Sequence, residues 1–208
     1  MSEPTDEHLF DAYRAGDTGA LRQLIVRYQP ELLRFLYRLV GDQSAAEDVF
    51  QETFLQLHLS QDGFDRSRKL RPWVFTIAAN KGRDYLRKRG RRRETALSAP
   101  SQGNREAFDL VDLLEIDVPD PGSGIANEEL SRRVQSVLEQ VSPTLREILL
   151  LAYFQKLTYV QIAEELGIPL GTVKSRLHAA VATFGKRWNA RHAGLDGAEA
   201  GENSGEAR

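Results

Sequence analysis

Cysteine is absent from the 208-residue sequence, and its absence excludes disulfides and thiolate metal sites. A chain that folds without disulfides is typical of a reducing compartment. Histidine is also scarce: His8, His58, His178 and His192 are scattered, without the spacing of metal ligands. We therefore expect no metal, no other cofactor and no catalytic site, because metal and acid–base chemistry need clustered histidines or carboxylates.

Long apolar runs are missing as well. No stretch approaches the roughly 18 apolar residues of a membrane-spanning helix, so we expect no membrane insertion. Residues 1–10 are acidic and polar, which is unlike a secretory signal peptide. These absences predict a cytoplasmic protein.

The net charge of -2 conceals two segments of opposite sign. Between residues 66 and 93 every charged residue is basic except Asp84, and between residues 94 and 129 every charged residue is acidic except Arg105. A basic segment attracts the phosphates of nucleic acid, and an acidic segment can lie near a basic partner. The alternative is that both segments are ordinary solvated surfaces.

Helical periodicity dominates the sequence and no strand pattern stands out, so we predict an all-α fold. Several residues indicate where the helices begin. Asp6 and Asp17 are expected to cap the first two helices, and Ser44 with Glu47 to form the capping box of a later one. Pro30 is expected to interrupt or restart the chain between two helices.

The organisation into domains follows from composition. Pro72 is expected to be the first residue of a helix that carries the basic residues to position 93. Turn and coil residues prevail after it, and the alternation of acidic and apolar residues in 108–118 favours a docking segment over a short helix without a core. We predict two small helical domains, 1–93 and 127–192, joined by an acidic flexible linker over 94–126 and followed by a disordered tail over 193–208.

Residues 158–188 contain two helical patterns with only a short turn between them. Thr158 with Gln161 indicates a capping box, Gly167 is expected to close the first helix, and the second helix has an apolar stripe. This is the helix-turn-helix arrangement, whose second helix lies in the major groove of DNA. The expected DNA contacts lie off the apolar stripe: Thr172, Lys174, Ser175, Arg176 and His178. A solvated helix face is the alternative.

Three stretches resemble the extracytoplasmic-function (ECF) sigma factors of bacterial RNA polymerase, which belong to the sigma-70 family. The stretch LTYVQIAEELGIPLGTVKSRLHAA resembles their region 4. The stretch YQPELLRFLYRLVGDQSAAEDVFQETFLQLH resembles regions 2.1 to 2.2, and FDRSRKLRPWVFTIAANKGRDYLRKRGRRR resembles regions 2.3 and 2.4. The resemblance covers about residues 6–93 and 127–190, in the order of the family and with an acidic linker between them.

This resemblance implies a sigma factor that binds core RNA polymerase, directs it to promoters through -10 and -35 elements and helps to open the DNA. In the family, the helix around AEDVFQETF binds the clamp helices of the β′ subunit. The docking residues that follow from this are Asp48, Gln51, Glu52 and Gln56. The other implied partners are the β flap, promoter DNA and, in some members, an anti-sigma factor.

The stretch from Phe64 to Arg87 resembles the part of the family that reads the -10 element and flips a base out of the stack. The implied contacts are Phe64, Asn80, Lys81, Arg83 and Arg87, since aromatic faces, amides and cations suit unpaired bases. Trp73 and Tyr85 either stack on bases too or pack in the core. The acidic linker resembles the connector that threads toward the polymerase active-site cleft, unless it is only a soluble spacer.

Two other kinds of binding protein would share parts of this sequence. A helix-turn-helix regulator that never joins the polymerase would have the same C-terminal half, but it would not need a docking helix beside a strand-opening block. A purely structural helical adaptor would bind neither core polymerase nor DNA.

Overall fold

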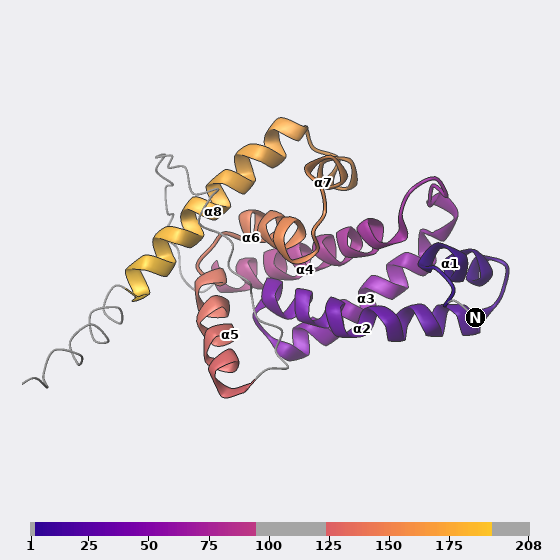
Figure 1. Ribbon diagram of the computed structural model, residues 1–208, viewed down its shortest axis with the longest axis horizontal. Helices are drawn as coiled ribbons and strands as arrows, with labels where there is room; N and C mark the ends of the chain where they lie inside the picture. Colours follow the sequence, from indigo (N-terminus) through magenta and orange to yellow (C-terminus); the bar gives the residue numbers. More distant parts are fainter. Residues whose placement is uncertain (1–2, 95–123, 193–208) are drawn as a thin grey trace, which may run out of the picture.

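The computed structural model describes residues 3–94 and 124–192, and within these ranges it is helical and without strands. This confirms the all-α prediction. We call residues 3–94 the N-lobe and residues 124–192 the C-lobe (Figure 1). The N-lobe contains α1 (Asp6–Arg14), α2 (Thr18–Val40), α3 (Gln43–Leu59), the 3-10 turn η1 (Gln61–Gly63) and α4 (Leu70–Glu94). The C-lobe contains α5 (Gly124–Leu138), α6 (Pro143–Leu149), the π-helical turn η3 (Leu150–Phe154), α7 (Tyr159–Leu166) and α8 (Leu170–His192).

The boundaries of the predicted linker are only partly covered by the described residues. Helix α4 ends at Glu94, where the linker was expected to begin. Helix α5 begins at Gly124, before the expected end of the linker at 126, and the domain boundary itself stays a prediction. The predictions for the acidic segment and for the tail concern 95–123 and 193–208, which lie outside the described residues.

The first helix is capped by a residue other than the predicted one. Thr5, not Asp6, is the N-cap of α1, and its side chain accepts the backbone N–H of His8. Asp6 makes tertiary contacts instead: its carboxylate accepts hydrogen bonds from Arg27 and from the hydroxyl of Tyr28, both at 2.6 Å. Asp17 caps α2 as predicted.

Pro30 lies inside α2, and the prediction of a break there is wrong. A proline removes one helical hydrogen bond and crowds the carbonyl one turn earlier. That carbonyl belongs to Val26, and both residues are on the exposed side of α2, where water can reach them. The rest of the helix is held by its buried face, so it continues to Val40 and ends at Gly41 in the left-handed conformation.

Two further helix starts differ from the sequence prediction. Asp42, not Ser44, caps α3 by accepting the N–H of Ala45 at 2.8 Å, so the predicted capping box is wrong. Glu47 instead accepts a hydrogen bond from the side chain of Gln43 at 2.9 Å. Pro72 is the third residue of α4 rather than the first, and it still lies in the first turn, where its missing N–H costs no helical bond.

The helix-turn-helix of the C-lobe agrees with its local sequence. Thr158 and Gln161 form the predicted capping box of α7. Gly167 ends that helix at a φ of 63°, the left-handed conformation that glycine adopts without a side-chain clash. The chain turns and re-enters a helix at Leu170. These signals are local, which is why the sequence alone was sufficient to place them.

Helix α4 packs against elements of both lobes: α2 and α3 on one side, α6 and α7 on the other (Figure 1). Its apolar residues Val74, Phe75 and Ala78 are fully buried. Gly82 lets α4 approach α2 closely, since a Cβ atom there would lie 2.5 Å from a methyl group of Leu39. The close contact with α2 holds α4 in place at the centre of the molecule.

We predict that Gly82→Ala lowers the free energy of unfolding by about 1 kcal/mol. The overlap with Leu39 costs about 1–3 kcal/mol, and the higher helix propensity of alanine offsets about 0.5–1 kcal/mol of it. Gly90→Ala is the matched control, because a Cβ atom there meets nothing within 4 Å, and it should be neutral or stabilising. Urea unfolding followed by circular dichroism measures both, and equal midpoints would contradict the close approach.

Candidate nucleic-acid interface

The outward face of α3 is polar, as the docking prediction requires. Asp48, Gln51 and Glu52 are exposed, whereas the opposite face of the helix is buried in the N-lobe core. Gln56 is half-buried, and its side-chain oxygen accepts a hydrogen bond from Lys81 at 3.0 Å. The structure therefore leaves three of the four expected docking residues free to meet a partner and turns the fourth toward α4.

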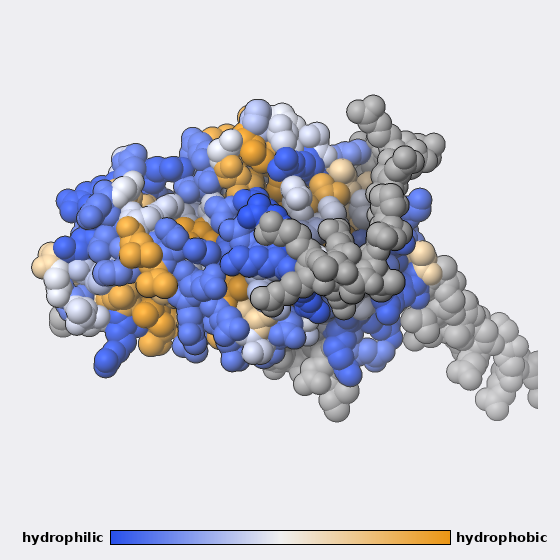
Figure 2. Space-filling model, turned by 180° about the vertical axis from the view of Figure 1, so that it is seen from behind, coloured by the Kyte–Doolittle hydropathy of each residue, from blue (hydrophilic) through white to orange (hydrophobic). Residues whose placement is uncertain are grey.

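Two leucines extend this face and were missed in the sequence. Leu55 and Leu59 are 58% and 69% exposed, although they are large and apolar. With Asp48 and Glu52 they follow a spacing of three or four residues, which places all four along one side of the helix. The signal that could have revealed them is that both leucines fall off the buried stripe of α3. The face of the molecule seen from behind is mostly hydrophilic and carries separate apolar patches (Figure 2).

The cations expected at the -10 element all have partners within the protein. Arg83 donates one hydrogen bond to Asn80 at 2.5 Å and another to Glu147 of the C-lobe at 2.8 Å. Arg87 pairs with Asp84 at 3.0 Å on the exposed surface, and Lys81 is bound to Gln56 as described. The structure brings Asn80, Lys81 and Arg83 together on α4, with Arg87 one turn further along.

Phe64 does not offer its ring to solvent in this structure, and its stacking on an unpaired base stays a prediction. The side chain is 8% exposed, and its ring lies against Trp73 at a centroid distance of 4.7 Å and edge-on to Phe10 at 5.3 Å. Trp73 packs in the same aromatic cluster, and Tyr85 is partly buried against the core. The sequence reasoning missed the cluster because Phe10 belongs to α1, far away in the chain.

Helix α8 presents the predicted polar face. Val173, Leu177 and Val181 are buried, whereas Lys174 and His178 are exposed. Of the remaining expected contacts, Ser175 is exposed and donates a hydrogen bond to the carbonyl of Thr172 at 3.1 Å, and Thr172 and Arg176 are half-buried. The arrangement fits a helix whose first turns can enter the major groove.

Glu147, a buried carboxylate of the C-lobe, pairs with one cation of α4. Glu147 lies on α6, its side chain is 1% exposed, and Arg83 reaches it across the boundary between the lobes. Burial raises the pKa of Glu147, and the positive charges of Arg83 and Arg176 oppose that rise by stabilising the carboxylate. Arg83, a residue expected at the -10 element, is therefore held by an acid of the C-lobe. No sequence pattern marked Glu147, because its role depends on the packing of the two lobes.

Comparison with known proteins identifies the family of the chain. The Sigma-70 region 2 family matches residues 24–92, and the Sigma-70, region 4 family matches residues 131–184. The chain is 30% identical to the ECF RNA polymerase sigma factor SigW of Bacillus subtilis (strain 168) over 165 residues, which cover 79% of this chain and 87% of that protein. The chain belongs to the ECF sigma factors. The resemblance noted in the sequence is thereby confirmed.

Two solved structures share the fold. The sigma factor RpoE from Bartonella quintana, in complex with the anti-sigma factor NepR, matches with a TM-score of 0.58 and 25% identity over 80% of this chain and 95% of that one. CnrH, in complex with the cytosolic domain of CnrY, matches with a TM-score of 0.62 and 24% identity over 89% of this chain and 97% of that one, which shows the fold alone.

As an ECF sigma factor, the chain binds core RNA polymerase and directs promoter-specific initiation of transcription. Within the described ranges, none of the helices is both long and apolar enough to cross a membrane. The same ranges contain no group of three side chains suited to hold a metal ion.

We predict that Phe64→Ala destabilises the N-lobe by about 3 kcal/mol or more, the usual cost of deleting a buried aromatic ring. Phe64→Leu keeps most of the apolar volume and should cost about half of that or less. Thermal unfolding of the two variants and of the parent, followed by circular dichroism, measures the difference. An unchanged midpoint for Phe64→Ala would show that the ring is not part of the core in solution.

Proposed function

We propose that this ECF sigma factor docks on core polymerase through α3, captures the opened -10 strand with α4 and reads the -35 element with α8. The observation that carries the proposal is that regions 2 and 4 occur in one chain, each with a polar helix face turned away from its own apolar core. The chain itself supplies binding surfaces rather than a catalytic site, and it needs no cofactor. Its working compartment is the cytoplasm, where the polymerase and the promoter are.

The docking surface consists of the exposed acids of α3 with the leucines beside them. Asp48 and Glu52 provide charge, and Leu55 and Leu59 provide apolar area that is otherwise left in water. A surface with an apolar centre beside charged groups is typical of a stable protein interface. We assign the clamp helices of the β′ subunit to it, and the β flap to the C-lobe.

The -10 surface consists of polar groups on α4. The amide of Asn80 can bond to a base edge, and Lys81, Arg83 and Arg87 can bind the backbone of a single strand. Phe64 and Trp73 act indirectly, because their packing fixes the loop that leads into α4. In this arrangement the aromatic cluster is a support for the reading surface rather than part of it.

The -35 surface is formed by the first turns of α8. Thr172, Lys174, Ser175, Arg176 and His178 supply donors to phosphates and base edges, and the helix N-terminus favours a phosphate. An anti-sigma factor is a further partner that we propose, since the similar RpoE structure contains one. Such an inhibitor would act by covering the surfaces described here.

Transcription in vitro tests the proposed function. The purified chain, added to core polymerase and genomic DNA, should produce RNA starts that share two spaced upstream motifs. Charge reversal at Asp48 and Glu52 together should abolish these starts and co-purification with core polymerase, while the helical content stays unchanged. Reversal of Glu3 and Asp11, two exposed acids of the same lobe, changes the net charge equally and should have little effect.

Two outcomes would contradict the proposal. If the Asp48 and Glu52 variant still co-purifies with core polymerase, α3 is not the docking surface. If the chain binds promoter DNA but gives no new starts with core polymerase, it acts as a helix-turn-helix regulator outside the polymerase.

We predict different effects for two cations of α8. Lys174→Ala should weaken binding to all sequences and reduce the salt dependence by about one unit, as expected for a phosphate contact. Arg176→Ala should cost about 1–3 kcal/mol on the preferred element and relax discrimination at one base pair, because its planar guanidinium suits bidentate recognition. Binding isotherms of the full chain with core polymerase, over several salt concentrations and single-base variants of the element, measure both. Unchanged binding by both variants would show that α8 does not contact the -35 element.

A further inference from the structure

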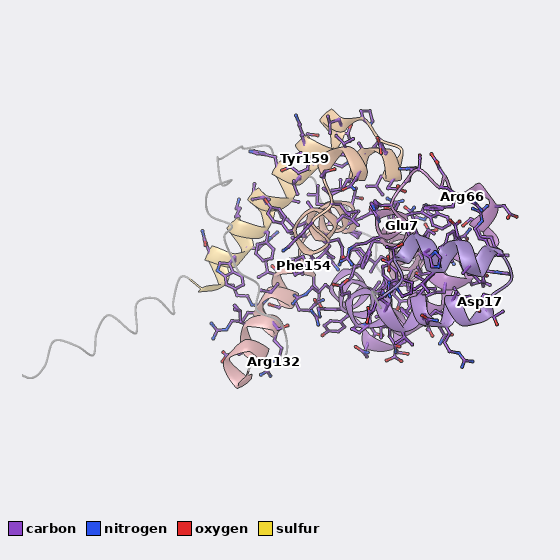
Figure 3. The ribbon with its side chains drawn as sticks, turned by 45° about the vertical axis from the view of Figure 1, so that its right-hand side comes forward. Glu7, Asp17, Arg66, Arg132, Phe154 and Tyr159 are labelled. Carbon is purple, nitrogen blue, oxygen red and sulfur yellow. The ribbon has the colours of Figure 1, made fainter. Side chains whose placement is uncertain are left out.

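Helix α1 contacts the segment that leads into α4, although it lies outside the matched family region. The Sigma-70 region 2 match begins at residue 24, whereas α1 covers Asp6–Arg14. We call residues 60–69, between α3 and α4, the entry loop. Glu7 of α1 and Arg66 of the entry loop are labelled at the same end of the molecule in Figure 3. Helix α1 is therefore placed to set the position of the entry loop.

The N-terminus of α4 is capped from a distant part of the sequence. The first N–H groups of a helix need acceptors outside the helix, and a preceding Ser, Thr, Asp or Asn commonly supplies one. Lys69 precedes Leu70, the first residue of α4, and its side chain contains no acceptor. Instead, a carboxylate oxygen of Glu7 accepts the N–H of Leu70 at 3.3 Å and lies 3.8 Å from the ammonium of Lys69. Glu7 thus takes the role of a cap from another helix.

Two aromatic residues of α1 hold the other parts of the same segment. The hydroxyl of Tyr13 is hydrogen-bonded to Nδ1 of His58, close to the end of α3 where the entry loop begins. The buried ring of Phe10 lies edge-on to Phe64 at a centroid distance of 5.3 Å and to Trp73 at 5.7 Å. Helix α1 therefore contacts the segment before, within and after the entry loop.

Two other contacts of the entry loop do not reach α4. Arg66 pairs with Asp11 at 3.2 Å, but both side chains are exposed, and exposed pairs contribute little to stability. Asp65 orders a turn within the loop, because its side chain accepts the N–H of Ser67 at 2.9 Å. The relation between the entry loop and α4 therefore depends more on Glu7 than on these contacts.

We propose that α1, through Glu7 and Tyr13, is a positioning element for capture of the -10 strand. It holds the entry loop and the first turn of α4 in a fixed relation without touching DNA itself. The inference rests on the proposed function, in which polar groups of α4, Asn80 among them, capture unpaired bases. A surface that is already ordered captures a strand more tightly, because ordering a loop on binding costs free energy.

The rate of promoter opening tests the role of Glu7, with holoenzyme and a promoter taken from the transcription experiment. Glu7→Ala removes the acceptor, and opening should slow by about fivefold, the usual effect of losing a cap. Glu7→Gln keeps a side-chain oxygen and should slow opening by about twofold or less. Asp11→Ala, on the same helix, is the matched control and should change little. Permanganate reactivity of the -10 thymines measures opening, while co-purification with core polymerase should equal the parent.

Discrimination at the -10 element separates positioning from a loss of folded protein. Less folded protein slows opening on every promoter by the same factor, whereas a displaced surface also loses its preference between bases. The ratio of opening rates on the preferred element and on its single-base variants should therefore fall by about threefold in Glu7→Ala. Glu7→Gln should restore most of the ratio. An opening rate or a ratio equal to the parent in folded Glu7→Ala overturns the proposal.

Two further variants complete the test. Tyr13→Phe keeps the buried ring and removes only the hydroxyl that binds His58, and it should change the rate and the ratio in the same direction. It decides the question if Glu7→Ala fails to fold by circular dichroism, and parental values then overturn the proposal. Asn80→Ala tests the proposed function itself. Slower opening in Asn80→Ala alone removes only the role of α1, whereas parental opening in Asn80→Ala overturns the -10 surface and this inference together.

Discussion

The packing of α4 between the lobes is the constraint on which the rest of the structure depends. One side of the helix is anchored against α2, where Gly82 and Leu39 meet closely, and the other side faces α6 and α7. A helix held in this way has little freedom to rotate, because buried side chains interlock. The position of Asn80 and Arg83 is therefore set by the core of the N-lobe, whereas the acid that pairs with Arg83 comes from the C-lobe.

Electrostatics explains why the C-lobe partners of Arg68 and Arg83 are acids. The basic segment repels itself unless carboxylates, phosphates or water compensate its charge. An exposed pair such as Arg87 with Asp84 contributes about 0–1 kcal/mol and does not hold two lobes together. Glu147 and Glu165 are largely buried, and burial raises the pKa of each while the facing arginines oppose the rise. Glu147 and Glu165, unlike the surface pair, each join residues of the two lobes.

The features that the sequence could predict are those decided within one turn of the chain. The capping box of Thr158 and Gln161 and the left-handed Gly167 depend only on neighbouring residues. The family resemblance added the expected docking and reading residues. Their polar side chains lie off the apolar stripes, and their roles stay predictions. Asp42 and Ser44 are both suitable N-cap residues, and local preference does not distinguish them. In the structure Asp42, not Ser44, caps α3.

The features that could not be predicted from the sequence depend on elements that are far apart in the chain. Phe64 is buried because Phe10 of α1 and Trp73 of α4 close around it. Pro30 stays helical because the buried face of α2 outweighs one lost hydrogen bond. Glu147 has a partner only because α4 packs against α6. Tertiary packing overrides local preference in each of these cases.

The accessibility of α3 bears on the proposed docking. Helix α3 packs mainly against α2, α4 and η1, all within the N-lobe, so the contacts between the lobes leave its outward acids and leucines accessible. Arg83 of α4 instead pairs with Glu147 of the C-lobe. Docking through α3, as we propose it, therefore needs no break in the contacts between the lobes.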